Sequence, residues 1–178
     1  LVGSEMCIRD SYGVDFDIKN TPAPDQTAFG FALDISRCVG CRKCVYACVG
    51  ENNLSRDVEI HWIRVLRMER GGFDLESADA YYDPETVPEE GYYYLPVQCQ
   101  QCENPACVKA CPVKATWREP DGIVAVDYDW CIGCRTCMAA CPYGARHCNW
   151  NHPVLPAEEI TTDVHLLGNR PRRSGVVV

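Results

Sequence analysis

Cysteine is the residue type in this chain whose number and spacing could support chemistry. The 178 residues include 14 cysteines, and twelve of these fall into three groups that span 11 to 13 residues each. Four thiols packed into one short run are typical of a metal site, whereas disulfide scaffolds space their cysteines irregularly along loops. Group one is Cys38, Cys41, Cys44 and Cys48; group two is Cys99, Cys102, Cys107 and Cys111; group three is Cys131, Cys134, Cys137 and Cys141.

The spacing within these groups favours cubane 4Fe–4S clusters. A C-x2-C-x2-C loop can wrap three irons of a cubane, and the next cysteine leaves on a helical turn and ligates the neighbouring cluster. The alternatives are disulfides and structural zinc, and zinc usually takes its ligands from two separated C-x2-C pairs. Pro112 and Pro142 directly follow groups two and three. We expect these prolines to end the helical turn and to direct the chain into the next strand.

Because the fourth cysteine of each group is expected to ligate the neighbouring cluster, the spacing predicts which residues share a cluster. Groups two and three exchange their fourth cysteines, so both of their clusters are complete within the chain. Group one has no such partner, which predicts a fourth cysteine group beyond Val178 and four clusters in the whole protein. The expected ligands are Cys99, Cys102, Cys107 and Cys141 for cluster A; Cys131, Cys134, Cys137 and Cys111 for cluster B; Cys38, Cys41 and Cys44 for an incomplete cluster C; and Cys48 for an incomplete cluster D.

Other residues near the three cysteine groups give weaker indications of a role at the clusters. Cys148 is interpreted as a packed thiol rather than a ligand, and the histidines, which lack ligand spacing, as structural. Four aromatic residues flank the loops and are expected to shield clusters from water. Seven basic residues either offset cluster charge or form a solvated surface. These residues are His61, His147, His152 and His165; Trp117, Trp130, Tyr143 and Trp150; and Arg37, Arg42, Lys43, Lys109, Lys114, Arg135 and Arg146.

Short strands and turns must position these groups. Alternating or β-branched and aromatic residues predict strands, and the pair Asp121-Gly122 predicts a hairpin turn. Residues 69–91, rich in acids, glycine and proline, are expected to form an exposed insertion. The expected elements are strands over residues 29–35, at the start of 60–68 and over 92–97, and a hairpin of 115–118 with 123–126.

An internal repeat relates the second and third groups. Cys107–Ala115 aligns with Cys137–Ala145 at an offset of 30 residues. Each copy is expected to contain a cysteine loop, a short helix and a strand, and two such copies predict a small α+β fold in which loops dominate.

Charge and apolar pattern exclude two classes of partner. The formal net charge is −8, so a phosphate backbone would repel the chain and nucleic-acid binding is not expected. Bound clusters, at about −2 each when oxidised, would make it more acidic. No apolar run approaches the roughly 20 residues that cross a bilayer, and we expect no direct membrane span. The sequence also lacks a phosphate-binding loop or nucleophile elbow, which predicts an electron carrier with no catalytic site of its own.

The three groups and their flanks resemble a known family. The chain is similar to the four-cluster, ferredoxin-like iron–sulfur subunits of membrane-bound respiratory complexes. These include the electron-transfer subunits of dimethyl sulfoxide, polysulfide and tetrathionate reductases, and the related subunit of alternative complex III. Cys148 departs from the family, in which an aromatic residue is expected. The resemblance runs from about Phe29 to Val178 and is carried by Asp34–Cys44, Gln98–Pro112 and Asp129–Arg146, while Leu167–Arg172 resembles the approach to the family's fourth cysteine group.

This resemblance implies a ferredoxin-like α+β fold with a pseudo-two-fold repeat of cysteine loop, short helix and strand, and a loop-rich insertion. It implies a line of clusters between a catalytic molybdopterin-type subunit and an integral, quinone-linked membrane subunit, with Cys48 ligating the cluster of the fourth group. The chain would be a peripheral subunit of a membrane-bound complex, on its cytoplasmic or its periplasmic side. The alternatives are a relay subunit of a hydrogenase or formate dehydrogenase, a freestanding polyferredoxin and, least favoured, a zinc-binding structural module.

The chain is expected to consist of five parts. Residues 1–11, which include Cys7, are interpreted as a non-native segment derived from an adaptor. The remaining parts are 12–60, the first cysteine group and half of an outer dicluster module; 61–97, the insertion and a strand; 98–150, the inner dicluster module; and 151–178, a return segment towards the fourth cysteine group.

Overall fold

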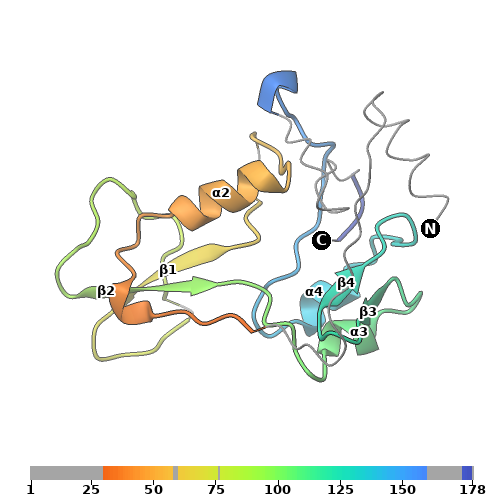
Figure 1. Ribbon diagram of the computed structural model, residues 1–178, viewed down its shortest axis with the longest axis horizontal. Coiled ribbons are helices and arrows are strands. Elements are labelled where there is room, and N and C mark those ends of the chain that lie inside the picture. Colours follow the sequence, from red (N-terminus) through yellow and green to blue (C-terminus); the bar gives the residue numbers. More distant parts are fainter. Residues whose placement is uncertain (1–29, 58–59, 76, 160–173, 178) are drawn as a thin grey trace.

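The computed structural model describes residues 30–57, 60–75, 77–159 and 174–177 (Figure 1). Its elements form a first lobe, with helix α2 and strands β1 and β2, and a second lobe, with helices α3 and α4 and strands β3 and β4. The predicted adaptor segment with Cys7, His165 and the segment 167–172 lie outside the described residues. The elements are η1 (Ile35–Arg37), α2 (Lys43–Glu51), β1 (Arg64–Glu69), β2 (Tyr92–Val97), α3 (Ala106–Ala110), β3 (Thr116–Arg118), β4 (Val124–Val126), α4 (Thr136–Ala140) and η2 (Ala157–Glu159).

The first lobe is built on an antiparallel ribbon whose residues favour extended backbone. β2 contains three consecutive tyrosines, and aromatic side chains suit a half-buried strand. It pairs with β1 from Arg64 opposite Val97 to Glu69 opposite Tyr92. Pro96 is tolerated because both strands of a two-stranded ribbon are edge strands. The strand predicted over 92–97 is confirmed, whereas the strand predicted near residue 60 begins only at Arg64.

Helix α2 packs on this ribbon through one set of buried hydrophobic side chains. These are Val45 of α2, Val65 of β1, Tyr94 of β2 and Tyr82, each at most 4 % exposed. The rings of Tyr82 and Tyr94 lie 5.3 Å apart and are tilted by 52°, a favourable arrangement for an aromatic pair. Burial of these side chains fixes α2, and the cysteines that it carries, on the ribbon.

Most described residues of the predicted insertion, 69–91, are exposed as expected, but Tyr82 is a buried exception. Asp79 forms a bridge to Arg67 of β1, which brings this segment back along the ribbon. The Tyr82 side chain then enters the core, and its hydroxyl donates a hydrogen bond of 2.6 Å to the carbonyl oxygen of Gly40. The sequence pattern missed this contact because the surrounding acids and prolines have the composition of a solvated loop.

The second lobe joins two short helices to a hairpin. Helices α3 and α4 contact each other, and α3 also contacts β3. Strands β3 and β4 pair antiparallel from Thr116 opposite Val126 to Arg118 opposite Val124, which confirms the predicted hairpin. Gly122 has a φ of +97°, a conformation that favours glycine and explains the Asp-Gly turn.

Two predicted strands do not form in the described residues. Residues 30–34 turn into η1 instead, where the Asp34 side chain accepts a hydrogen bond of 3.0 Å from the Ser36 N–H. The apolar residues of this segment are exposed, Phe31 by 76 %, so their alternation does not mark a buried face. After group three, the expected strand is reduced to a single bridge between Cys148 and Val177.

The helices of the described residues are short. Helix α2 has nine residues, and within the described ranges no helix is long and apolar enough to cross a membrane. The described chain combines these helices with two two-stranded sheets, and it is therefore a small α+β fold in which loops dominate, as expected.

Candidate metal centres

All three cysteine loops share one backbone feature. The residue before the second cysteine is left-handed in each loop, with φ of 78° at Gly40, 45° at Gln101 and 68° at Gly133. In groups one and three the residue after that cysteine, Arg42 or Arg135, is left-handed as well. Alternating left-handed and right-handed residues turn successive N–H groups to one side and form a concave site for an anion, including the sulfurs of iron–sulfur clusters. The loops therefore have a backbone shape that fits a cluster.

Two of these positions require glycine for reasons of space as well as conformation. A Cβ atom at Gly40 would overlap the Tyr94 ring, and one at Gly133 would overlap the carbonyl oxygen of Gly175. Neither contact is possible without movement of the neighbouring atoms. The first loop thus lies directly on the core of the first lobe, and the third loop lies directly on residues 174–177.

The first three cysteines of group three lie together. The Gly133 N–H donates a hydrogen bond of 3.4 Å to Cys131 Sγ, and the Thr136 hydroxyl donates one of 3.4 Å to Cys134 Sγ. The Thr136 hydroxyl lowers the pKa of Cys134, because it stabilises the thiolate. Burial raises the pKa of Cys137, and the charges of Cys131 and Cys134 contribute to the same rise. The three thiols are therefore close enough to interact electrostatically, and the ligand set of cluster B stays a prediction.

Group two gathers its first three cysteines in the same way. Burial raises the pKa of Cys99, and the charges of Cys107 and Cys102 contribute to this rise. A hydrogen bond from the backbone of Gln101 opposes it. The three thiols are therefore close enough to interact electrostatically, although the group has an x4 spacing where the other groups have x2.

The fourth cysteines of groups two and three occupy equivalent places at the ends of neighbouring helices. Cys111 follows α3 and Cys141 follows α4, with ψ of 111° and 113°. Cys111 Sγ accepts a hydrogen bond of 3.2 Å from the Ala115 N–H, and Cys141 Sγ accepts one of 3.5 Å from the Ala145 N–H. Each helix ends two residues before a proline, as predicted, because the residue before proline favours extended backbone. The exchange of these cysteines between clusters remains a prediction.

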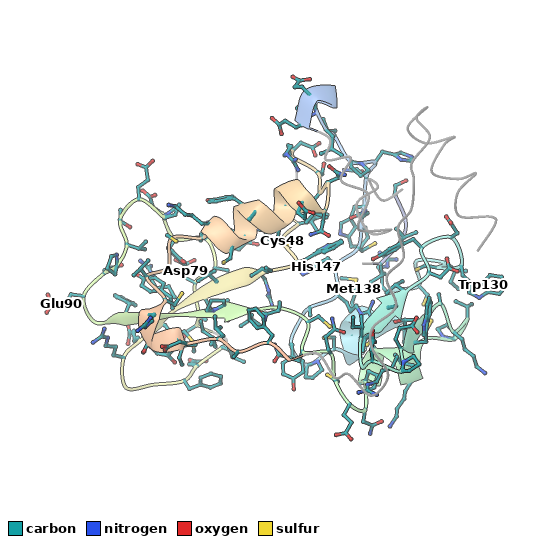
Figure 2. All side chains as sticks on the ribbon, viewed as in Figure 1. Cys48, Asp79, Glu90, Trp130, Met138 and His147 are labelled. Atoms are coloured by element: carbon teal, nitrogen blue, oxygen red, sulfur yellow. The ribbon has the colours of Figure 1, made fainter. Side chains whose placement is uncertain are left out.

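Group one starts in the loop after η1 and continues on α2. Cys44 and Cys48 are one helical turn apart, so their side chains lie on the same side of the helix. Burial raises the pKa of both thiols, and the charges of Cys38 and Cys41 contribute to the rise at Cys44. Cys48 Sγ accepts a hydrogen bond of 3.4 Å from the Asn52 amide, on the side of α2 that faces β1 (Figure 2). Which clusters these four thiols serve remains a prediction.

The basic residues near the groups divide by burial, which the sequence could not show. Arg42 and Arg146 are buried, at 7 % and 8 % exposure, and the other five lie at the surface. Arg42 lies against the ring of Tyr82, at 5.9 Å from its centroid. Arg146 instead faces the cysteines, since its Nη2 lies 3.4 Å from Cys107 Sγ and 2.9 Å from the Thr116 hydroxyl oxygen. Arg146 is therefore a site residue that the cysteine spacing alone does not reveal.

The structure agrees with the prediction for Cys148 but not with the prediction for two of the aromatic residues. Cys148 is 5 % exposed, which fits its interpretation as a packed thiol, and burial raises its pKa. Trp130 and Trp150 are 64 % and 61 % exposed, and Figure 2 shows Trp130 at the outer edge of the second lobe. The Trp150 ring packs under the Arg135 guanidinium, 4.6 Å from it. These positions give no support to the prediction that the two rings shield clusters from water.

Two histidines line a cavity of about 260 Å³ where the first lobe meets the segment after α4. His61 and His147 share its wall with Arg42 and Arg64. Burial lowers the pKa of His147 to about 4, and the charge of Arg64 and His61 acts in the same direction. His147 is therefore neutral at neutral pH, as a structural residue packed beside a cation would be.

The donor set around the three loops consists of thiols. None of the thirteen described cysteines is in a disulfide, and within the described ranges no three Cys, His, Asp or Glu side chains are close enough to hold a single metal ion. A cubane takes one thiolate on each of four irons, so its ligands are spread more widely than those around one ion. The thiols, the left-handed loops and the hydrogen bonds to sulfur fit 4Fe–4S clusters.

Comparison with known families agrees with this geometry. Two family models, each described as a 4Fe–4S dicluster domain, match residues 37–115 and 91–173. Together they cover all three cysteine groups. Fold, site and matches define a ferredoxin-like 4Fe–4S protein, and they decide in favour of iron–sulfur clusters over the zinc and disulfide alternatives.

Individual relatives show which ferredoxin-like 4Fe–4S proteins the chain is similar to. The chain is 38 % identical over 160 residues to the menaquinone reductase iron–sulfur cluster-binding subunit of Nitratidesulfovibrio vulgaris, a match of 84 % of this chain and 56 % of that protein. It is 41 % identical over 123 residues to one chain of the anaerobic dimethyl sulfoxide reductase of Escherichia coli, with shares of 69 % and 56 %. It is 44 % identical over 118 residues to one subunit of the selenate reductase of Mesobacillus selenatarsenatis, with shares of 66 % and 35 %.

The chain belongs to the family of ferredoxin-like iron–sulfur subunits that these relatives represent, which confirms the family expected from the cysteine motifs. It spans about half the length of the curated relatives that it matches, at 52 % and 56 % of two of them. The match over residues 37–115 contains groups one and two, and the match over 91–173 contains groups two and three.

Proposed function

We propose that the chain relays electrons between a molybdopterin-type catalytic subunit and a quinone-linked integral membrane subunit, as the iron–sulfur subunit of an oxidoreductase complex. The observation that carries the proposal is the common backbone shape of the three cysteine loops, left-handed before the second cysteine in each. Relatives that are named as parts of dimethyl sulfoxide reductase and menaquinone reductase support it. The subunit would be peripheral, with its membrane contact made through a partner.

The proposed role assigns electron movement to this chain and bond chemistry to another subunit. A 4Fe–4S cluster supplies one-electron transfer when it is bound. The thiolates of the three groups would hold the irons, and the N–H groups of Ala115 and Ala145 would stabilise negative charge on the fourth cysteines. Cys99 and Cys137 are half-buried, which would limit the access of water to each inner site.

We infer that the two inner clusters are related by a pseudo-two-fold repeat. Residues 30 positions apart share their conformation, since φ is 56° at Lys114 and 59° at Gly144. The hydrogen bonds from Ala115 and Ala145 to the preceding fourth cysteine are equivalent in the same way. This equivalence supports reciprocal ligation, in which each fourth cysteine serves the cluster of the other loop. The proposed ligand sets are Cys99, Cys102, Cys107 and Cys141 for cluster A, and Cys131, Cys134, Cys137 and Cys111 for cluster B.

The outer pair of clusters is proposed to involve group one and a fourth group outside the described residues. Cys38, Cys41 and Cys44 would hold cluster C, and Cys48 would ligate cluster D. Under this proposal, residues 12–60 form half of an outer module, 61–97 the insertion and a strand, 98–150 the inner module and 151–178 the return segment. The whole protein would then carry four clusters.

Isolation of the native complex tests the relay. The full-length subunit, tagged and purified from membranes, is expected to bring down a molybdenum-containing subunit and an integral membrane subunit. Its clusters, followed by absorbance and electron paramagnetic resonance, should be reduced by a menaquinol analogue or reoxidised by the corresponding quinone within the turnover time of the complex. Recovery of a soluble, partner-free subunit with intact clusters would contradict the relay and favour a freestanding polyferredoxin. Copurification with a hydrogenase or formate dehydrogenase subunit would favour the other alternative.

Paired cysteine variants test the ligand exchange. Cys102→Ala and Cys141→Ala should eliminate the same cluster signal, and Cys134→Ala and Cys111→Ala should eliminate the other. Cys148→Ser, a change at a thiol outside both ligand sets, is the matched control and should leave both signals intact. If Cys141→Ala and Cys134→Ala removed the same signal, each loop would be using its own fourth cysteine, and the exchange would be wrong.

A further inference from the structure

Arg146 contacts one of the two inner ligand sets and interacts electrostatically with both. It follows group three in the sequence, but its guanidinium reaches group two, where Nη2 lies 3.4 Å from Cys107 Sγ. The Thr116 hydroxyl oxygen, 2.9 Å from the same nitrogen, holds it in this position at the start of β3. The side chain is 8 % exposed, so water does little to screen its charge.

The charges that face Arg146 belong to cysteines of both groups. Burial on its own would lower the pKa of Arg146, but the hydrogen bond to Cys107 and the charges of Cys107, Cys137 and Cys99 outweigh it and raise the pKa. The guanidinium therefore stays protonated. Among the ion pairs that join described residues, none pairs Arg146 with a carboxylate. The contact at 3.4 Å is with the Cys107 sulfur. Cys99 and Cys137 also act on the guanidinium, so both ligand sets would present negative sulfur to it once their cysteines bind iron as thiolates.

We propose that Arg146 is a positioning residue that raises the reduction potentials of both inner clusters, and of cluster A more than cluster B. This inference rests on the proposed function, because it takes the two ligand sets as cluster sites. Reduction adds one negative charge to a cluster, and a nearby cation in a poorly screened position stabilises the reduced form more than the oxidised form. Cluster A should respond more because Arg146 hydrogen-bonds directly to its ligand Cys107.

The surface cations of the same lobe cannot substitute for Arg146. Arg118 lies on the same hairpin, two residues beyond Thr116, and is exposed. Charges in water are screened within about 10 Å at ordinary salt concentrations, so the loss of an exposed cation should have little effect on a buried site. Arg118→Gln is therefore the matched control, since it removes the same charge from the same hairpin without removing a contact to sulfur.

The test is a redox titration of the full-length subunit, purified anaerobically with its clusters, and followed by electron paramagnetic resonance. Wild type, Arg146→Gln, Arg146→Lys and Arg118→Gln are compared at equal iron and sulfide content, with the signals assigned by the cysteine variants described above. Arg146→Gln should shift both inner midpoint potentials to more negative values, with the larger shift at cluster A. Arg146→Lys, which keeps the charge, should stay close to the wild-type potentials, and Arg118→Gln should leave both potentials unchanged.

The outcomes separate this inference from the proposed function. Intact clusters in Arg146→Gln with unchanged potentials would overturn the role of Arg146 and leave the electron-relay function standing. Absence of iron–sulfur signals in wild type would overturn the function itself. If Arg146→Gln lost its clusters, Arg146→Lys would decide the question, because its shorter side chain should leave a small residual shift at cluster A alone. Unchanged potentials there would overturn the larger effect on cluster A that is attributed to the contact between Arg146 and Cys107.

Discussion

The carbonyl oxygen of Gly175 lies directly against Gly133 in the group-three loop, in the place that a Cβ atom would occupy. The segment 174–177 is held there by two backbone hydrogen bonds to Asn149, of 2.7 Å and 3.0 Å. Val176 and Val177 are almost fully buried. The group-three loop, which we propose holds cluster B, is therefore supported by a part of the chain more than forty positions away in sequence.

Substitution Gly133→Ala should weaken cluster B. The methyl group would collide with the Gly175 carbonyl, and an L-residue in the left-handed region costs about 1–2 kcal/mol on its own. We expect reduced occupancy and faster thermal loss of the cluster B signal, measured by electron paramagnetic resonance. Gly91→Ala is the matched control, because Gly91 has a φ of +86° but no neighbouring atom within 4 Å of the place that a Cβ would take. Equal effects of the two changes would show that conformational strain, and not the contact with Gly175, is responsible.

Substitution Tyr82→Phe should loosen the group-one loop. The change removes a buried hydroxyl that donates to the carbonyl oxygen of Gly40, and it leaves a buried acceptor unsatisfied at a cost of about 1–3 kcal/mol. We expect a thermal midpoint lower by several degrees, measured by loss of cluster absorbance on heating. Tyr81→Phe removes the neighbouring hydroxyl from a ring that is 72 % exposed, and it should change the midpoint little. A Tyr82→Phe protein as stable as wild type would argue against this contact.

His147 should make stability depend on pH in the acid range. Its pKa is about 4 in the folded chain because of burial, with Arg64 and His61 contributing, against an ordinary value of 6.5. Between these values the unfolded state takes up more protons, so stability is complete above pH 6.5 and falls as pH decreases towards 4. The loss has an upper bound of roughly 3 kcal/mol.

The variant His147→Gln separates this effect from the acid sensitivity of the clusters, which both proteins share. Chemical unfolding of wild type and variant is compared at neutral pH and at several lower values. The difference in free energy of unfolding between the two should shrink as pH falls, since wild type alone loses the contribution of neutral His147. A difference that stays constant across the range would contradict the inference from burial.

The cysteine chemistry and the local turns could be predicted from the sequence because their causes are local. Loop spacing, the Asp121-Gly122 turn and the helix ends before Pro112 and Pro142 depend on a few neighbouring residues. The alternation over residues 29–35 led to a strand prediction that was wrong, because the alternation is also only local. A period-two pattern shows which side chains share a face, and it does not show that a partner covers that face.

The contacts that the sequence did not reveal are all long-range. Tyr82 enters the core from a segment with the composition of a loop, and Arg146 reaches Cys107 across 39 positions. Neither has a spacing signal, because a single buried residue has no period. The approach of Gly133 to Gly175 is likewise a product of tertiary folding. The sequence feature that relates to this contact is a glycine directly before the second cysteine in two of the loops, Gly40 and Gly133.

Metal and sulfide analysis tests the central claim most directly, namely that the inner two cysteine groups hold two complete cubane clusters. The chain of residues 1–178 is reconstituted anaerobically with iron and sulfide, desalted, and analysed for iron, acid-labile sulfide and zinc. Clusters A and B should together account for about eight irons and eight sulfides per chain, with essentially no zinc. A colourless protein with stoichiometric zinc and no labile sulfide would contradict the account.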